Sequence, residues 1–219
     1  MGNTTIILFD IDYTLFDVGY FDINFSKLLS PILSLPEESL RKKSTEIIIA
    51  TISQEGFLDI EKYLSAFLRE IGKEADKAKV EEVLFGGSFF KDGFYKEVEE
   101  TLRHLQGKVR IGIFSQGDES FQSAKITQSG LKDFFENELV YIKKNKLDFL
   151  PLLQEKHGND RMYLVDDKPG VLHTVKEHMP GVFTIWIKRG RHANQAQSIK
   201  DFAPDKIITH LSEIIPLIK

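Results

Sequence analysis

Cysteine is absent from this chain of 219 residues. Its absence excludes disulfide bonds, thiolate catalysis and cysteine-ligated zinc, and it is typical of proteins kept in a reducing cytoplasm. Long apolar segments are also absent, since none approaches the roughly 18 residues that a membrane-spanning helix needs. The first ten residues, MGNTTIILFD, lack the basic stretch of a secretory signal peptide. We therefore expect a cytoplasmic protein that does not contact a membrane.

An excess of positive charge is absent as well. The 29 lysines and arginines face 33 aspartates and glutamates, which gives a net charge of −4. This balance provides no general attraction to nucleic acid or to an anionic membrane, so the expected partner is a small molecule. The six histidines show neither H-x-H nor H-E-x-x-H spacing and do not indicate a metal site. Nothing in the sequence indicates an oligomeric state.

Short apolar runs, bounded by turn residues, alternate with segments of helical spacing. These runs cover Thr5 to Phe9, Val109 to Phe114, Leu139 to Ile142, Met162 to Val165 and Val182 to Ile187. The alternation predicts an α/β fold in which a mostly parallel sheet lies between layers of helices. A short edge strand and a final helix are predicted in the last stretch, DKIITHLSEIIPLIK.

One interval breaks the alternation, because residues 10–108 separate the first two runs and a crossover needs only about a dozen. Most of this interval has helical spacing. Helices are predicted from Pro36 to about Ser53, across 58–72 with Asp59 and Gly72 as caps, and up to Gly87. We therefore predict a helical insert over 18–91 and a core formed by 1–17 and 92–219.

Two aspartates, Asp10 and Asp12, follow the first apolar run in the sequence TIILFDIDYTL. In an open α/β sheet, ligands bind outside the carboxyl ends of the strands, where these residues are expected. Like charges this close repel each other unless a cation or a shared proton lies between them. A calcium loop is excluded, because its sixth position would be Leu15 rather than glycine and its twelfth Phe21 rather than glutamate.

A second acidic pair, Asp166 and Asp167, ends the run MYLV. If the two strands are neighbours, three or four carboxylates converge on one point. Hard oxygen ligands of this kind suit Mg²⁺, which commonly joins one or two carboxylates to a phosphate. The alternative is that Asp166 and Asp167 simply begin a turn before Lys-Pro-Gly.

Two further strand ends carry polar residues. Ser115, Gln116 and Gly117 follow a buried run and precede a helix that Asp118 is placed to cap, which is a pattern that can bind an anion. A lysine cluster (Lys143, Lys144 and Lys146) follows the next run, and one of these lysines could neutralise a phosphate. A third basic group (Lys188, Arg189, Arg191 and His192) is predicted to lie in a solvated loop. The alternative is that this group makes a weak contact with an anionic substrate.

In these segments the chain resembles the haloacid dehalogenase (HAD) superfamily of hydrolases. FDIDYTL is similar to the family's motif I, FSQG to motif II, the cluster at 143–146 to motif III and VDD to motif IV, in the family's order. The resemblance covers nearly the whole chain. It implies a Rossmann-like, three-layer core with strand order 5-4-1-2-3 and an α-helical cap domain inserted directly after motif I, where the 18–91 insert lies.

The resemblance also implies roles for the acidic residues. Asp10 would be the nucleophile that accepts a phosphoryl group, and Asp12 would be the general acid and base. Mg²⁺ would be bound by Asp10, by the backbone carbonyl of Asp12 and by Asp167. Asp166 would lie next to the metal ligands without binding the ion directly, although Asp166 and Asp167 could exchange these roles.

For the phosphate, the resemblance implies that Ser115, Gln116 and Gly117 would hold the transferring oxygens, while Lys146 would offset their charge. Lys144 stays possible as the motif III lysine, because Asn145 and Leu147 depart from the family's pattern.

Asp12 separates reaction types within the family. A halide leaving group needs no proton, and true dehalogenases lack an acid at this position. We therefore expect a Mg²⁺-dependent phosphatase acting on a small phosphorylated metabolite through an aspartyl phosphate on Asp10. The alternatives are a phosphomutase with the same residues and a non-catalytic binding protein on the same scaffold.

Overall fold

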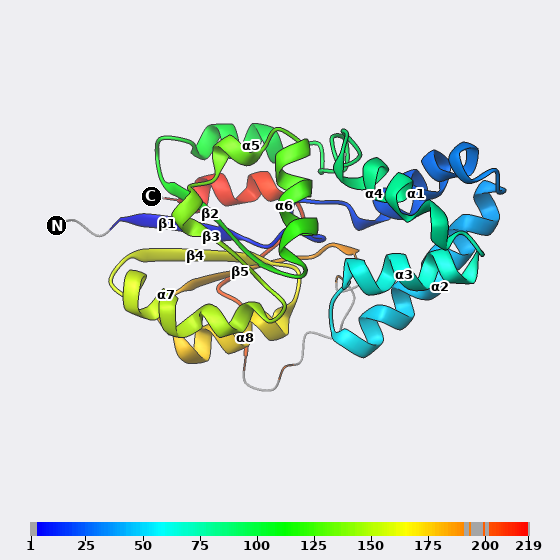
Figure 1. Ribbon diagram of the computed structural model, residues 1–219. Coiled ribbons are helices and arrows are strands. Elements are labelled where there is room, and N and C mark those ends of the chain that lie inside the picture. Colours follow the sequence, from blue (N-terminus) through cyan, green and yellow to red (C-terminus); the bar gives the residue numbers. More distant parts are fainter. Residues whose placement is uncertain (1–3, 191–192, 194–198, 200–201, 219) are drawn as a thin grey trace. The chain divides into compact units, whose positions relative to one another are not determined.

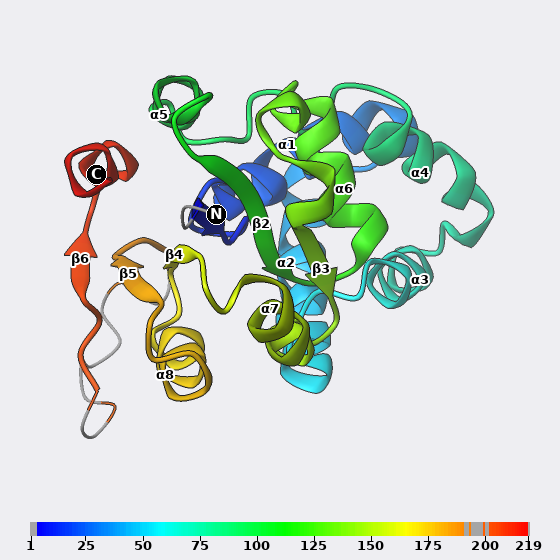
Figure 2. The ribbon, with the colours of Figure 1, turned by 90° about the vertical axis from the view of Figure 1, so that its left-hand side faces the viewer.

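A computed structural model describes residues 4–190, 193, 199 and 202–218. A parallel six-stranded sheet forms its centre, in the order β3-β2-β1-β4-β5-β6 (Figures 1 and 2). The strands are β1 (Thr5–Phe9), β2 (Arg110–Gln116), β3 (Val140–Lys143), β4 (Arg161–Asp166), β5 (Phe183–Ile187) and β6 (Lys206–Ile208). The expected 5-4-1-2-3 order is confirmed, and β6 extends it by one edge strand.

The strands form where the sequence is almost continuously apolar, because both faces of this sheet are covered. Helix α5 (Val98–Leu105) and a 3-10 helix (Leu211–Leu217) lie over one face, while α7 (Leu150–His157) and α8 (Pro169–His178) lie over the other (Figures 1 and 2). The core under α7 and α8 includes Phe114, Leu164 and Trp186, each at most 2% exposed. Burying one such side chain contributes roughly 1.5–3 kcal/mol.

A second set of helices follows β1. It comprises α1 (Val18–Leu33), α2 (Glu37–Glu55), α3 (Ile60–Glu70), a 3-10 turn (Glu74–Asp76) and α4 (Lys77–Phe85). By its contacts the chain forms two compact units. One consists of residues 1–17, 94–116 and 131–219, and the other of 18–93 together with 117–130. The helical unit therefore contains the predicted 18–91 insert and also α6 (Glu119–Gln128).

Aromatic side chains fill the interior of the helical unit. Phe21 stacks on Phe25 with ring centroids 5.0 Å apart, and it meets Phe121 of α6 edge to face at 5.6 Å. Phe90 meets the same Phe121 ring at 5.4 Å. Such pairs contribute roughly 0.5–1.5 kcal/mol beyond their burial, so they account for the assignment of α6 to this unit.

Helix caps follow the sequence closely. The Asp59 carboxylate accepts from the amide of Lys62 at the start of α3, and Asp118 accepts from Phe121 at the start of α6. Gly72, with φ +66°, follows the end of α3 as predicted. The final helix is a 3-10 helix, and Pro216 within it has no amide hydrogen to donate. Within the described ranges, no helix is long and apolar enough to cross a membrane.

Candidate active site

Three carboxylates meet at the carboxyl ends of β1 and β4. These strands are neighbours, and Phe9 pairs with Val165, so Asp10 comes to lie beside Asp166. The amide of Asp10 donates to the Val165 carbonyl at 3.0 Å. One oxygen each of Asp10, Asp166 and Asp167 lies within 4.8 Å of the others, and all three residues are buried. The predicted convergence of carboxylates from two strand ends is therefore present.

Lys146 is enclosed by these acids. It begins a 3-10 helix (Lys146–Phe149) whose cap, Asn145, accepts from the Leu147 amide. The Lys146 Nζ lies 3.0 Å from Asp10 Oδ1 and 2.5 Å from Asp166 Oδ2. Burial alone would lower the pKa of Lys146, but the two carboxylates outweigh it and raise the pKa above its usual value. Lys144 is exposed, so Lys146 is the lysine of this cluster that reaches the acids.

The electrostatics of Asp167 favour a cation. Burial, followed by the charges of Asp166 and Asp10, raises the pKa of Asp167 to about 9. Both carboxylate oxygens of Asp166 are engaged, one by Lys146 and the other by the amide of Lys168 at 2.9 Å. Three carboxylates facing one another form an all-oxygen donor set that fits Mg²⁺.

The loop after β1 is folded back on itself. The Ile11 carbonyl accepts from the amides of Leu15 and Phe16 at 2.9 and 2.8 Å, and Tyr13 has a φ of +59°. Asp12 is partly exposed, and its backbone pairs with Phe16. The carboxylate of Asp12 is not part of the group of three acids.

Two buried hydroxyls lie on this side of the sheet domain. Ser115 is the next-to-last residue of β2, which pairs with β1, and it is fully buried. Its Oγ has no hydrogen-bond partner among the described residues, and the same holds for Thr14 Oγ1. A buried hydroxyl that forms no hydrogen bond is available to a ligand. Gln116 ends β2, and Gly117 turns the chain toward α6 with a φ of +151°.

Arg189 is a residue of this domain that sequence reasoning misjudged. Its side chain is only 9% exposed, and its Nη1 donates to the Thr14 carbonyl at 3.0 Å. The prediction of a solvated loop is therefore wrong for Arg189, while Arg191 and His192 lie outside the described residues. The position of Arg189 just after a strand does not indicate whether its side chain points into solvent or into the domain.

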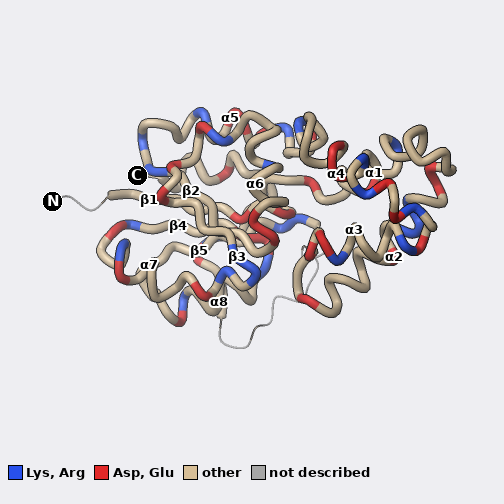
Figure 3. Tube along the Cα trace, in the orientation of Figure 1, with Lys and Arg blue, Asp and Glu red and all other residues tan. Residues whose placement is uncertain are grey.

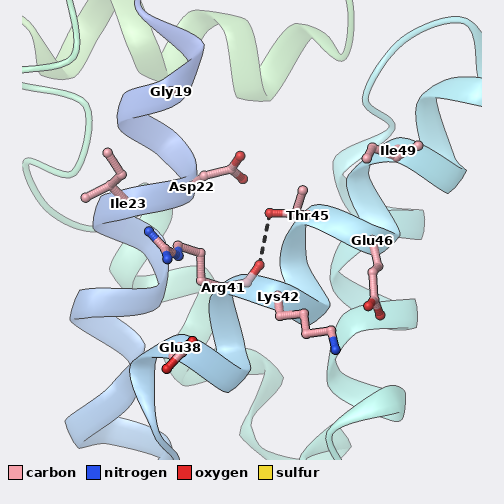
Figure 4. Close-up of a pocket in the computed structure, with 9 residues that line it drawn as sticks. All are labelled: Gly19, Asp22, Ile23, Glu38, Arg41, Lys42, Thr45, Glu46 and Ile49. Carbon is pink, nitrogen blue, oxygen red and sulfur yellow. Dashed lines mark hydrogen bonds between the residues drawn. The ribbon is translucent and has the colours of Figure 1, made fainter.

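The helical unit has a groove of its own between α1 and α2, with a volume of about 620 Å³ (Figure 4). Asp22 of α1 and Arg41 of α2 both line it. Burial raises the pKa of Asp22, and the charge of Arg41 opposes this shift. Acidic and basic residues are interspersed along both units (Figure 3).

A scan against models of known protein families and a search of curated proteins find no match. Solved structures do match. A haloacid dehalogenase-like hydrolase from Burkholderia xenovorans is 22% identical with a TM-score of 0.79, covering 99% of this chain and 97% of its own. The HAD-hydrolase YfnB from Bacillus subtilis, solved bound to magnesium, is 18% identical with a TM-score of 0.68 and full coverage of both chains.

An L-2-haloacid dehalogenase from Xanthobacter autotrophicus, solved with chloropropionic acid covalently bound, is 15% identical with a TM-score of 0.60. The match covers 99% of this chain and 98% of the dehalogenase. At these identities the likeness concerns the fold, so the chemistry has to be argued from the residues of this chain.

Proposed function

Since the chain has the fold of the haloacid dehalogenase superfamily of hydrolases, we propose that it is a Mg²⁺-dependent phosphatase of small phosphate monoesters. The observation that carries this proposal is the buried group of Asp10, Asp166 and Asp167, with Lys146 in contact with two of them. A site with this charge arrangement suits a divalent cation and a phosphate dianion together.

Asp10, Asp167 and the backbone carbonyl of Asp12 would hold the ion, and Asp166 would orient Lys146. When bound, Mg²⁺ supplies positive charge that lessens the repulsion between the Asp10 carboxylate and the phosphate. Lys146 supplies a positive charge next to Asp10, because its ammonium group is buried between Asp10 and Asp166.

The proposed reaction has two steps. Because Lys146 contacts Asp10 Oδ1, we assign the attack to Oδ2, which bonds to phosphorus as the bond from phosphorus to the ester oxygen breaks. Protonated Asp12 gives its proton to the departing oxygen. Ionised Asp12 then takes a proton from water as the water oxygen bonds to phosphorus and the bond from phosphorus to Asp10 Oδ2 breaks. Inorganic phosphate leaves, and both carboxyl groups return to their first state.

The hydroxyl of Ser115 supports the assignment of a phosphate as the ligand, because this hydroxyl is buried and has no hydrogen-bond partner in the described part of the chain. It would donate to one phosphoryl oxygen, with backbone amides at Gln116 and Gly117 as further donors.

Asp12 favours phosphoryl transfer over dehalogenation. Several structures with this fold are L-2-haloacid dehalogenases, so halide release is the competing hydrolytic reaction. An alkoxide leaving group needs a proton, whereas a halide does not. A general acid at Asp12 would therefore assist only the release of an alkoxide. A phosphomutase would use the same residues and would be recognised by the return of the phosphoryl group to the substrate.

The test is turnover of p-nitrophenyl phosphate with and without Mg²⁺, with halide release from 2-chloropropionate measured in parallel. We expect Mg²⁺-dependent phosphate release that falls by at least about a thousandfold in Asp10→Asn and by about a hundredfold in Asp12→Asn. Asp133→Asn, an exposed acid elsewhere on the same domain, is the matched control and should keep its activity. Phosphate release that survives Asp10→Asn, or halide release alone, would refute the proposal.

A further inference from the structure

Arg189 joins four separate parts of the sheet domain. It follows the end of β5 by two residues. Its Nη1 donates to the Thr14 carbonyl in the loop after β1, and its Nε donates to the carbonyl of Thr209, which follows β6, at 3.3 Å. Its Nη2 forms an ion pair with Glu97, the residue before α5.

The surroundings of Arg189 hold its guanidinium in one orientation. The guanidinium carbon lies 4.2 Å from the centroid of the Tyr95 ring, which is a cation–π contact. Glu97 is 14% exposed and also accepts from the amide of Leu211 at 3.3 Å. An arginine held by stacking and by several fixed acceptors has few alternative orientations. It can therefore act as a rigid support for the group that it contacts.

The group that Arg189 contacts is the loop that follows β1 and contains Asp12. The Ile11 carbonyl accepts from Thr14, Leu15 and Phe16, and the backbone of Asp12 pairs with that of Phe16. A loop closed by so many of its own hydrogen bonds moves as one piece, so a contact to the Thr14 carbonyl also constrains Asp12.

Gly190 gives a second contact to the same loop. A Cβ atom at Gly190 would lie 2.0 Å from Cδ1 of Tyr13, so the absence of a side chain lets the two segments approach. Gly190 and Tyr13 both have positive φ, at +55° and +59°. Arg189 and Gly190 together meet two successive residues of the loop directly after Asp12.

We propose that Arg189 is a positioning residue, which fixes the loop of Asp10 to Asp17 and thereby aims the Asp12 carboxyl at the leaving oxygen. The kinetic part of this inference rests on the proposed function, because it takes Asp12 as the acid. The structural part, that Arg189 immobilises the loop, stands independently. A misplaced acid affects the transition state more than substrate binding, so loss of Arg189 should lower kcat rather than raise KM.

The experiment compares Arg189→Met, Arg189→Lys and Lys188→Met. Lys188 is the adjacent cation, with its Nζ 5.0 Å from the Trp186 ring, and it serves as the matched control. Hydrogen exchange of peptides covering residues 10–17 reports on the loop without any need for turnover. In Arg189→Met we expect exchange there to accelerate by at least about tenfold, and in Lys188→Met by less than about twofold.

The same variants are assayed with p-nitrophenyl phosphate. We expect kcat to fall by at least about tenfold in Arg189→Met with KM within about threefold of the parent, and Arg189→Lys to recover part of the loss. If Arg189→Met does not fold, Glu97→Gln, which removes the partner charge, should accelerate exchange in the same segment.

Unchanged exchange at 10–17 would overturn the inference. Exchange that accelerates equally in β4 would also overturn it, because Arg189 would then support the whole fold and not the loop. Local acceleration with an unchanged kcat would refute the positioning of Asp12. If the parent protein turns over no phosphate ester, the proposed function fails, and the exchange measurement alone decides whether Arg189 holds the loop.

Discussion

Lys146 illustrates how single residues of the site depend on one another. An isolated buried ammonium is unfavourable, but Lys146 has Asp10 and Asp166 within 3.0 Å. Three carboxylates against one ammonium leave a formal excess of two negative charges if all are ionised. A divalent cation would balance that excess, which connects the structural role of Lys146 to the proposed chemistry.

Replacement of Lys146 tests this connection at the residue scale. In Lys146→Met, the phosphate-ester kcat should fall by about a hundredfold, because a positive charge beside the transferring oxygens is lost. Lys144→Met, two residues away and exposed, should stay within about twofold of the parent. Steady-state kinetics of both variants decides which lysine acts. A larger loss in Lys144→Met would reverse the assignment.

Ser115 should separate stability from ligand binding. Its Oγ is buried and forms no hydrogen bond among the described residues, so Ser115→Ala removes an unsatisfied polar group. We expect the free energy of unfolding to stay the same or to rise by up to about 1 kcal/mol. Competitive inhibition by inorganic phosphate should weaken by about tenfold, since one donor to the phosphate is lost. Urea unfolding and inhibition constants measure the two effects. Weakened folding with unchanged inhibition would contradict the assigned role.

Single elements were predictable where their signal was local. The five apolar runs became β1 to β5, and the caps Asp59 and Asp118 mark the starts of α3 and α6. The bounds of α1 were not predicted, because Pro31 lies inside it, although its buried phenylalanines and leucines recur every fourth residue. Asp10, Asp166 and Asp167 were predictable because strand ends in a parallel sheet share one edge. Arg189 was not, since its partners Thr14, Glu97 and Thr209 are distant in sequence.

The link between β5 and β6 should depend on pH. Asp205 accepts from the Thr184 amide and hydroxyl and from Lys176 Nζ, each at 2.8 Å. Burial raises the pKa of Asp205, but these donors outweigh it and the pKa is lowered overall. The stability that ionised Asp205 contributes is therefore present above its unfolded pKa and is lost as the pH falls through the lower folded pKa.

For Asp205→Asn we expect a loss of about 1–2 kcal/mol in the free energy of unfolding at pH 7. Below about pH 4 the difference from the parent should shrink, because the parent then loses the same charge. Urea titrations at pH 7 and pH 3 measure the change. A difference that is equal at both pH values would show that the ionised form of Asp205 contributes nothing.

At the scale of the whole molecule, the acidic cluster predicts that Mg²⁺ stabilises the fold. A ligand present at 100 times its Kd adds about 2.7 kcal/mol, which in a chain of this size raises Tm by roughly 5–10 °C. In Asp167→Asn the shift with Mg²⁺ should disappear, while the metal-free Tm should not fall, because the raised pKa of Asp167 already keeps its carboxyl largely neutral at pH 7, as the asparagine amide is. Thermal unfolding with and without MgCl₂, with Asp133→Asn as control, measures both. A full Mg²⁺ shift in Asp167→Asn would place the ion elsewhere.

Because α6 belongs to the helical unit, that unit is formed by two separate stretches of the chain. Phe121 of α6 packs on Phe21 and Phe90, and Gln128 accepts from the Phe90 amide and donates to the Leu84 carbonyl. A graft of residues 18–93 alone onto another scaffold would remove the α6 partners of these rings and backbone groups. A viable chimaera must also carry residues 117–130, so it needs four splice points instead of two, and one of them directly follows Gln116.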